Sequence, residues 1–66
     1  MQVKVFIEEF NKNLVIDIEG KVIDLLRKLR INSNTVIVVC NGEIVTEDYK
    51  IEKGDRFSIL NVGSVG

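Results

Sequence analysis

The first twenty residues alternate between apolar and polar side chains, which is the pattern of two β-strands. On the first strand, residues 2–8, the apolar positions of one face are Val3, Val5 and Ile7. Phe6 breaks this alternation and falls on the other face. On the second strand the apolar positions are Leu14, Ile16 and Ile18. The two runs predict an antiparallel hairpin that is joined by the mostly polar residues 9–13.

Beyond Gly20 the period changes from that of a strand to that of a helix. Over residues 21–30 the apolar positions follow at i, i+3, i+4 and i+7, with charged residues between them. These positions are Val22, Leu25, Leu26 and Leu29. The spacing predicts one amphipathic helix of about ten residues. Because so short a helix is not stable alone, we expect its leucines to pack on the inner face of the sheet.

The second half of the chain predicts three further strands, at residues 35–40, 43–45 and 56–62. The first of them is apolar on both faces, as expected for a strand near the middle of a sheet. Asn41-Gly42 follows it and is a strong hairpin-turn signal, because both residues tolerate positive φ. Residues 46–53 are polar and irregular, and their expected anchors are Tyr49 and Ile51.

Gly54-Asp55 marks the turn before the last strand. On that strand Phe57 and Ile59 are expected to face the helix, while Ser58 and Leu60 face away from it.

The order of elements is ββαβββ, or ββαββ if the short strand at 43–45 is counted with its hairpin. One helix over a mostly antiparallel sheet predicts an α+β domain of two layers. Right-handed connections make a β-grasp (ubiquitin-like) roll the simplest arrangement. In it, a mixed sheet of four to five strands packs on one helix, with the first and last strands adjacent at the centre. We expect residues 1–62 to form this single domain and residues 63–66 to form a flexible C-terminal tail.

The length of 66 residues limits the kind of function that the domain can have. At this size folding buries only about 60% of the surface of the unfolded chain, so most side chains serve the core. Histidine, the commonest general acid and base near neutral pH, is absent. We therefore expect a carrier or binding protein rather than an enzyme, with no metal site and no cofactor.

The charge pattern also narrows the partners. Lys and Arg number 9 and Asp and Glu number 10, for a net charge of -1 without a basic block, so we expect no nucleic-acid partner. The longest apolar run, residues 36–40, is far shorter than the roughly 20 residues that cross a bilayer, so we expect no membrane association. Cys40 has no partner for an internal disulfide, which favours a cytoplasmic location. We expect a monomer when the protein is free.

Few side chains of the domain could carry chemistry themselves. Cys40 could be a nucleophile or a sulfur-accepting thiol, a role that requires a low pKa and exposure. Its place at the end of an apolar strand favours a small buried hydrophobe instead. The acidic pairs Glu8-Glu9 and Glu47-Asp48 lie in polar turns, where solvated charge is the expected state.

The last six residues, from Asn61 onward, could act through the chain end itself. Fully extended, they reach roughly 20 Å, which is enough to carry a terminal carboxylate into the active site of a partner. A partner enzyme can adenylate such a carboxylate and open it to attack by a sulfur, amine or thiol group. Ordinary terminal fraying explains the same composition, and the residues alone leave both interpretations open.

Four segments of the chain, taken in their order and spacing, carry a resemblance to a known family. They are Val3-Lys4-Val5, Val22-Ile23-Asp24-Leu25-Leu26, Val38-Val39-Cys40-Asn41-Gly42-Glu43-Ile44-Val45 and Gly54-Asp55-Arg56-Phe57-Ser58-Ile59. The chain resembles the small β-grasp sulfur carriers of the ThiS and MoaD family, with archaeal ubiquitin-like modifiers as relatives. The resemblance spans nearly the whole chain, and its most specific parts are the Asn-Gly-Glu-Ile-Val segment and the later Gly-Asp.

This resemblance implies that Gly66 is the acyl and thiocarboxylate carrier. The implied partners are an adenylating enzyme of the ubiquitin-activating (E1-like) class and a sulfur-accepting synthase, in thiamin, molybdopterin or tRNA thiolation pathways. The family ends in Gly-Gly, whereas here Val65 stands in place of the penultimate glycine. A β-branched residue restricts the backbone angles at the point where the chain end of the family members passes through a narrow channel. The departure implies a tolerant partner, a longer natural chain, or a carrier fold that no longer carries.

We expect the partner to dock on the sheet face opposite the helix and to receive the tail. The predicted contact residues are Phe6, Val15, Leu60, Val62, Gly63, Ser64 and Val65. Packing of one or more of the apolar residues under a loop is the alternative. A competing hypothesis, which Val65 favours, is a β-grasp module that binds a protein and never forms a thiocarboxylate. A small RNA-binding β-grasp domain is a third hypothesis, and it would require a basic face.

Overall fold

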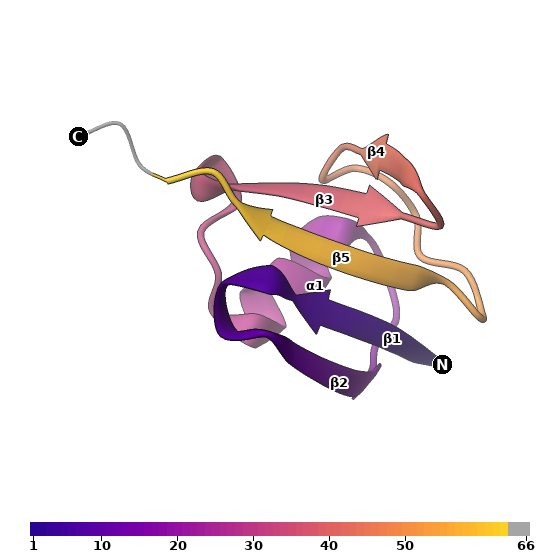
Figure 1. Ribbon diagram of the computed structural model, residues 1–66. Coiled ribbons are helices and arrows are strands. Elements are labelled where there is room, and N and C mark those ends of the chain that lie inside the picture. The colour runs from indigo at the N-terminus through magenta and orange to yellow at the C-terminus, as the bar shows by residue number, and fades with distance from the viewer. Residues whose placement is uncertain (64–66) are drawn as a thin grey trace.

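The computed structural model describes residues 1–63, and its elements follow the predicted order (Figure 1). The strands are β1 (Gln2–Ile7), β2 (Lys12–Asp17), β3 (Val36–Cys40), β4 (Glu43–Val45) and β5 (Arg56–Asn61). The helical elements are α1 (Val22–Leu29) and two single 3₁₀ turns, η1 (Glu8–Phe10) and η2 (Ser33–Thr35). Within residues 1–63, none of these helices is long and apolar enough to span a membrane.

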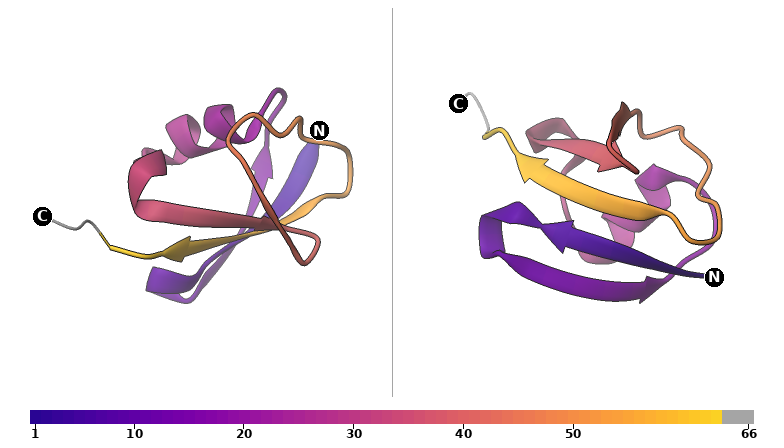
Figure 2. Two further views of the ribbon diagram at one scale, coloured as in Figure 1. Left: turned by 90° about the horizontal axis from the view of Figure 1, so that it is seen from above. Right: turned by 45° about the vertical axis from the view of Figure 1, so that its right-hand side comes forward.

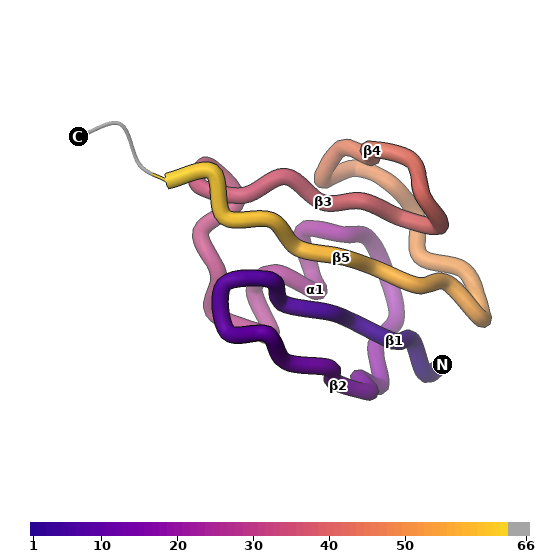
Figure 3. The backbone as a smooth tube through the Cα atoms, in the orientation of Figure 1, coloured from indigo at the N-terminus to yellow at the C-terminus, as the bar shows by residue number. Residues whose placement is uncertain are grey.

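The sheet runs in the order β2-β1-β5-β3-β4. β1 and β5 are parallel neighbours, and the other neighbouring pairs are antiparallel. The tube in Figure 3 shows the β1–β2 hairpin on one side of β5 and the β3–β4 hairpin on the other. The prediction that the first and last strands are adjacent at the centre of a β-grasp roll is therefore confirmed.

The core lies between the sheet and α1, which covers one face of the sheet (Figure 2). Alternate residues of β1 and β5 enter this core, as a period of two requires. The most deeply buried side chains are Val3, Val5, Val22, Leu25, Leu26, Ile51, Phe57 and Ile59. Because full burial of one such side chain contributes roughly 1.5–3 kcal/mol, sheet and helix stabilise each other, as predicted.

The irregular segment 46–53 supports the start of α1. The N–H of Val22 donates to the carbonyl of Tyr49 at 2.9 Å, and the N–H of Ile51 donates to the carbonyl of Gly20 at 2.8 Å. The first N–H groups of a helix have no acceptor inside the helix, so segment 46–53 supplies an acceptor for the N–H of Val22. The side chain of Ile51 is only 2% exposed, which confirms its predicted role as an anchor.

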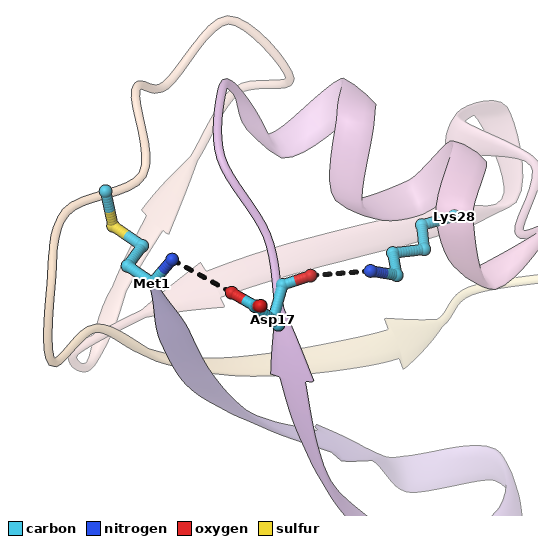
Figure 4. Close-up of polar contacts among 3 residues, drawn as sticks. All are labelled: Met1, Asp17 and Lys28. Atoms are coloured by element: carbon cyan, nitrogen blue, oxygen red, sulfur yellow. Dashed lines mark hydrogen bonds and ion pairs between the residues drawn. The ribbon is translucent and has the colours of Figure 1, made fainter.

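Asp17 ties the N-terminus and α1 to the end of β2 (Figure 4). The α-ammonium group of Met1 lies 2.9 Å from Oδ1 of Asp17. Lys28 Nζ donates to the backbone carbonyl oxygen of Asp17 at 2.6 Å. The hydrogen bond and the charge of the ammonium group lower the pKa of the Asp17 carboxyl. These contacts hold the end of an edge strand against the helix.

Candidate functional site

The sheet face opposite α1 carries an apolar patch. We define the open-face patch by five side chains: Phe6, Ile37, Val39, Ile44 and Leu60. They share the far face because they alternate with core residues along β1, β3 and β5, and because Ile44 on β4 pairs directly with Val39. The register places Val39 opposite Ile44 and Ile37 opposite Leu60. Four of the five are half-buried and Ile44 is 74% exposed, so the patch is an uncovered surface of the kind that binds proteins.

Two of the five apolar residues predicted to contact a partner, Phe6 and Leu60, belong to this patch. Val15 lies on the same face and is 63% exposed, but it sits on the edge strand β2 opposite Lys4. Lys4 is itself paired with Arg56 across β1 and β5. The one direct cross-strand neighbour of Val15 is therefore charged, and Val15 has no direct pairing with a member of the open-face patch.

The hydrophobic pattern does not single out the other three members, Ile37, Val39 and Ile44. The signal for the first two is the apolar run at 36–40, a pattern that predicts a strand near the middle of a sheet. Because α1 covers only one face, the second apolar row of β3 stays at the surface. Ile44 follows from the same geometry, since it pairs with Val39 on that face.

The described chain ends at Val62 and Gly63, just beyond β5. Val62 is 57% exposed, and its N–H donates to the carbonyl of Thr35 at 2.9 Å. Gly63 is exposed and has a φ of +79°. Figure 1 shows this end of β5 on the side of the domain away from the N-terminus. The remaining predicted tail residues, Ser64, Val65 and Gly66, lie outside the described residues.

At the other end of β5, a buried carboxylate joins the two turns that carry the most specific part of the resemblance. Asp55 is 5% exposed and accepts hydrogen bonds from Asn41 Nδ2 (3.0 Å), the Tyr49 hydroxyl (3.0 Å) and the Glu52 N–H (2.8 Å). The N–H of Arg56 donates to Oδ1 of Asn41 at 3.0 Å. Burial raises the pKa of Asp55, but these hydrogen bonds outweigh it, so the pKa lies below its ordinary value.

Cys40 lies beside this carboxylate and is 4% exposed. Burial raises the pKa of the Cys40 thiol, which is the opposite of what a nucleophile needs. Hydrogen bonding to Cys40 and to Asp55 also raises the pKa of Tyr49, so the phenol stays protonated at neutral pH. The interpretation of Cys40 as a small buried hydrophobe is confirmed.

The acidic pairs predicted to be solvated are exposed. They are Glu8, Glu9, Glu47 and Asp48. Within the described part of the chain, no group of three side chains is arranged to hold a metal ion.

A family model described as small archaeal modifier protein 2 (SAMP2) matches residues 1–62. The match spans the whole described domain except Gly63, and it includes both the open-face patch and the network around Asp55. A comparison with curated protein sequences found no significant match.

Three solved structures share the fold. SAMP1 from Haloferax volcanii has a TM-score of 0.76 and 16% identity, with 100% of both chains covered. A ubiquitin-like protein from the hyperthermophilic archaeon Caldiarchaeum subterraneum has a TM-score of 0.62 and 14% identity over 100% of both chains. A ubiquitin-like protein from Trypanosoma brucei has a TM-score of 0.61 and 18% identity over 94% of each chain. At these identities the likeness shows the ubiquitin-like β-grasp fold alone.

The matched family is one of small archaeal modifier proteins. The sequence resemblance to the sulfur carriers includes archaeal ubiquitin-like modifiers as relatives. The closer assignment to the ThiS and MoaD carriers themselves stays a prediction.

Proposed function

Because the chain belongs to the small archaeal modifier protein 2 family, we propose that it is a carrier whose C-terminal carboxylate is activated by a partner enzyme. The observation that carries this proposal is the family match over residues 1–62. The geometry agrees with it, because the central strand β5 delivers the exposed residues Val62 and Gly63 to one end of the domain. The residues after them would bring Gly66 to the partner.

The proposed chemistry places the reacting group on Gly66 and the catalysis in an E1-like enzyme. A carboxylate oxygen of Gly66 attacks the α-phosphorus of ATP, and pyrophosphate leaves. The acyl adenylate then has AMP as its leaving group, so a sulfur or amine nucleophile can displace it. Attack by sulfur leads toward a thiocarboxylate for sulfur transfer, and attack by an amine gives an amide bond to a target. Neither branch needs an acid, base or nucleophile from this domain, in which the only cysteine is buried.

The open-face patch is the proposed docking surface for the activating enzyme. Its half-buried members give a firm apolar floor, and Ile44 projects an apolar side chain that is 74% exposed. Desolvation of such a patch is a favourable term in protein association. A sulfur-accepting synthase in thiamin, molybdopterin or tRNA thiolation is the proposed later partner. We propose a free monomer in the cytoplasm, where ATP is available for the activating step.

Val65 favours one competing function, that of a protein-binding module which is never activated. Glycine at the penultimate position would let the chain end adopt backbone angles that a β-branched residue disfavours. In that case the open-face patch would still bind a protein, but the chain end would take no part.

Intact mass spectrometry separates these functions. The protein is incubated with ATP, sulfide as the sulfur donor and an E1-like enzyme from the same genome, and its mass is compared with that of a chain lacking Gly66. We expect wild type, and not the shortened chain, to gain an adenylate or to exchange oxygen for sulfur. An unchanged wild-type mass together with activation of the Val65→Gly variant would favour the module. An unchanged mass for both would contradict the proposal.

A further inference from the structure

The side chain of Asn61 connects the tip of the β1–β2 hairpin to the point where the chain leaves the sheet. Its Nδ2 donates to Oε2 of Glu9 at 2.9 Å, and its Oδ1 accepts from the N–H of Gly63 at 2.7 Å. The carboxylate of Glu9 can only accept and the N–H of Gly63 can only donate. The two contacts therefore require one orientation of the amide, and only a side chain with both a donor and an acceptor satisfies them together.

These contacts determine how the backbone leaves β5. The N–H of Val62 extends the pairing by one residue through its bond to the Thr35 carbonyl at 2.9 Å. At the next residue the bond to Asn61 holds the N–H of Gly63, whose φ of +79° favours glycine. An added Cβ at Gly63 would meet open space. The hydrogen bond to Asn61 fixes the orientation of the peptide group that joins Val62 to Gly63.

We propose that Asn61 is a positioning residue for activation of the chain end, and that Glu9 holds it in place. The Asn61 amide holds the peptide group between Val62 and Gly63 in place, so the last described part of the chain is ordered before the activating enzyme binds. This inference rests on the proposed function. Ordering a backbone residue on binding costs conformational entropy, and residues ordered beforehand spare that cost. Asn61 and Glu9 take no part in the reaction itself.

Steady-state kinetics of ATP–pyrophosphate exchange test this role, with the E1-like enzyme held constant and the carrier varied. For Asn61→Ala we expect the KM for the carrier to rise about tenfold, as for the loss of one ordering hydrogen bond, with kcat little changed. Glu9→Ala should raise KM less, because the amide keeps its bond to Gly63. Glu8→Ala removes the adjacent exposed carboxylate, which makes no bond to Asn61, and should match wild type.

An exchange of donor and acceptor gives a sharper control. Asn61→Asp keeps an acceptor for the Gly63 N–H but sets a second carboxylate against Glu9, so KM should rise. Adding Glu9→Gln restores a donor for the new carboxylate, and the double variant should regain most of the wild-type KM. Melting temperatures should stay close to wild type throughout, because these side chains are exposed. A change in melting temperature without a change in KM would show a merely structural role and overturn the proposal.

The temperature coefficient of the Gly63 amide proton in the free protein supplies an independent readout. We expect a small coefficient in wild type, as for a hydrogen-bonded N–H, and a larger one in Asn61→Ala. An unchanged coefficient, or an unchanged KM in Asn61→Ala, overturns the positioning role while the proposed function stands. Absence of adenylation in wild type overturns both, and the two failures are thereby distinguished.

Discussion

Asp55 is the residue that couples the two turns at one end of the sheet. Its buried carboxylate accepts three hydrogen bonds, and these lower its pKa in the folded protein despite burial. In an unfolded chain the pKa of an aspartate is about 3.9. A group whose folded pKa is depressed stabilises the fold above its unfolded pKa. That stability is lost as the pH falls through the folded pKa.

We predict that Asp55→Asn lowers the free energy of unfolding at pH 7 by about 1–3 kcal/mol, because buried donors lose their acceptors. Urea denaturation at pH 7 and at pH 3 measures the free energy of unfolding of wild type and variant. The gap between wild type and variant should narrow at pH 3, below the unfolded pKa, because the unfolded wild-type chain takes up a proton there more readily than the folded carboxylate does. Asp48→Asn makes the same change on an exposed side chain of the same segment and should stay within about 0.5 kcal/mol of wild type. Equal effects of the two substitutions would contradict the role of the network.

The local conformation of single residues could be predicted from the sequence, whereas the hydrogen bonds that join distant residues could not. Asn41-Gly42 and Gly54-Asp55 are recognisable as turns because each uses backbone angles that its own residues tolerate. The hydrogen bond from Asn41 to Asp55 joins residues 14 apart in sequence and depends on how β3 pairs with β5. The spacing of hydrophobic residues along the chain does not show which residues of β3 and β5 are paired. The same holds for Asn61, whose partner Glu9 is 52 residues away.

Two residues before helix α1, the chain has a position that favours glycine. Gly20 has a φ of +117°, and a Cβ there would overlap Oδ2 of Asp24. That oxygen accepts the N–H of Lys21 at 2.9 Å and so caps the first turn of the helix. Gly20 therefore leaves room for the cap as well as for the turn of the chain.

We predict that Gly20→Ala lowers the free energy of unfolding by about 2–4 kcal/mol, since it adds backbone strain and displaces the capping carboxylate. Gly54→Ala is the matched control: its φ is +85°, but an added Cβ meets open space. Strain alone should cost this control about 1 kcal/mol. Both values follow from urea denaturation at neutral pH. A loss for Gly20→Ala no larger than that of the control would show that the Asp24 carboxylate moves aside at no cost.

The bounds of the elements were less predictable than their existence. The amphipathic spacing predicts about ten helical residues, whereas α1 has eight. It ends because Arg30 adopts the left-handed conformation, with a φ of +58°, and donates its N–H to the carbonyls of Leu26 and Arg27. Glycine commonly marks such a position, and arginine gives no sequence signal for it. The hairpin loop likewise contains the 3₁₀ turn η1, followed by Asn11 in the left-handed region.

For the whole molecule, the number of layers determines which apolar rows stay exposed. The order of strands and helix allowed the β-grasp roll to be predicted, because one helix and right-handed connections leave few arrangements. The same count implies that a single helix cannot cover both faces of five strands. The apolar row of β3 away from α1 must then remain at the surface. Local patterning does not show this, because it describes each strand without its neighbours.

Two exposed side chains on the open sheet face can test how far the docking surface extends. Ile44 and Val15 lie on the same sheet face and are similarly exposed, at 74% and 63%, but the direct cross-strand neighbour of Ile44 is the apolar Val39, whereas that of Val15 is Lys4. A side chain surrounded by apolar contacts is desolvated more completely in an interface and contributes more to binding. We therefore predict that Ile44→Ser weakens binding to the E1-like enzyme about tenfold and Val15→Ser about twofold or less.

Isothermal titration calorimetry with the E1-like enzyme measures the affinity of each variant. Thermal unfolding is the control: neither substitution should destabilise the domain, since both side chains face water. A larger effect for Val15→Ser would move the interface to the β2 edge. The charged pair Lys4 and Arg56 would then lie at its centre, and electrostatic attraction rather than apolar burial would have to drive association. In that case affinity should fall steeply with added salt, whereas binding through the open-face patch should depend little on it.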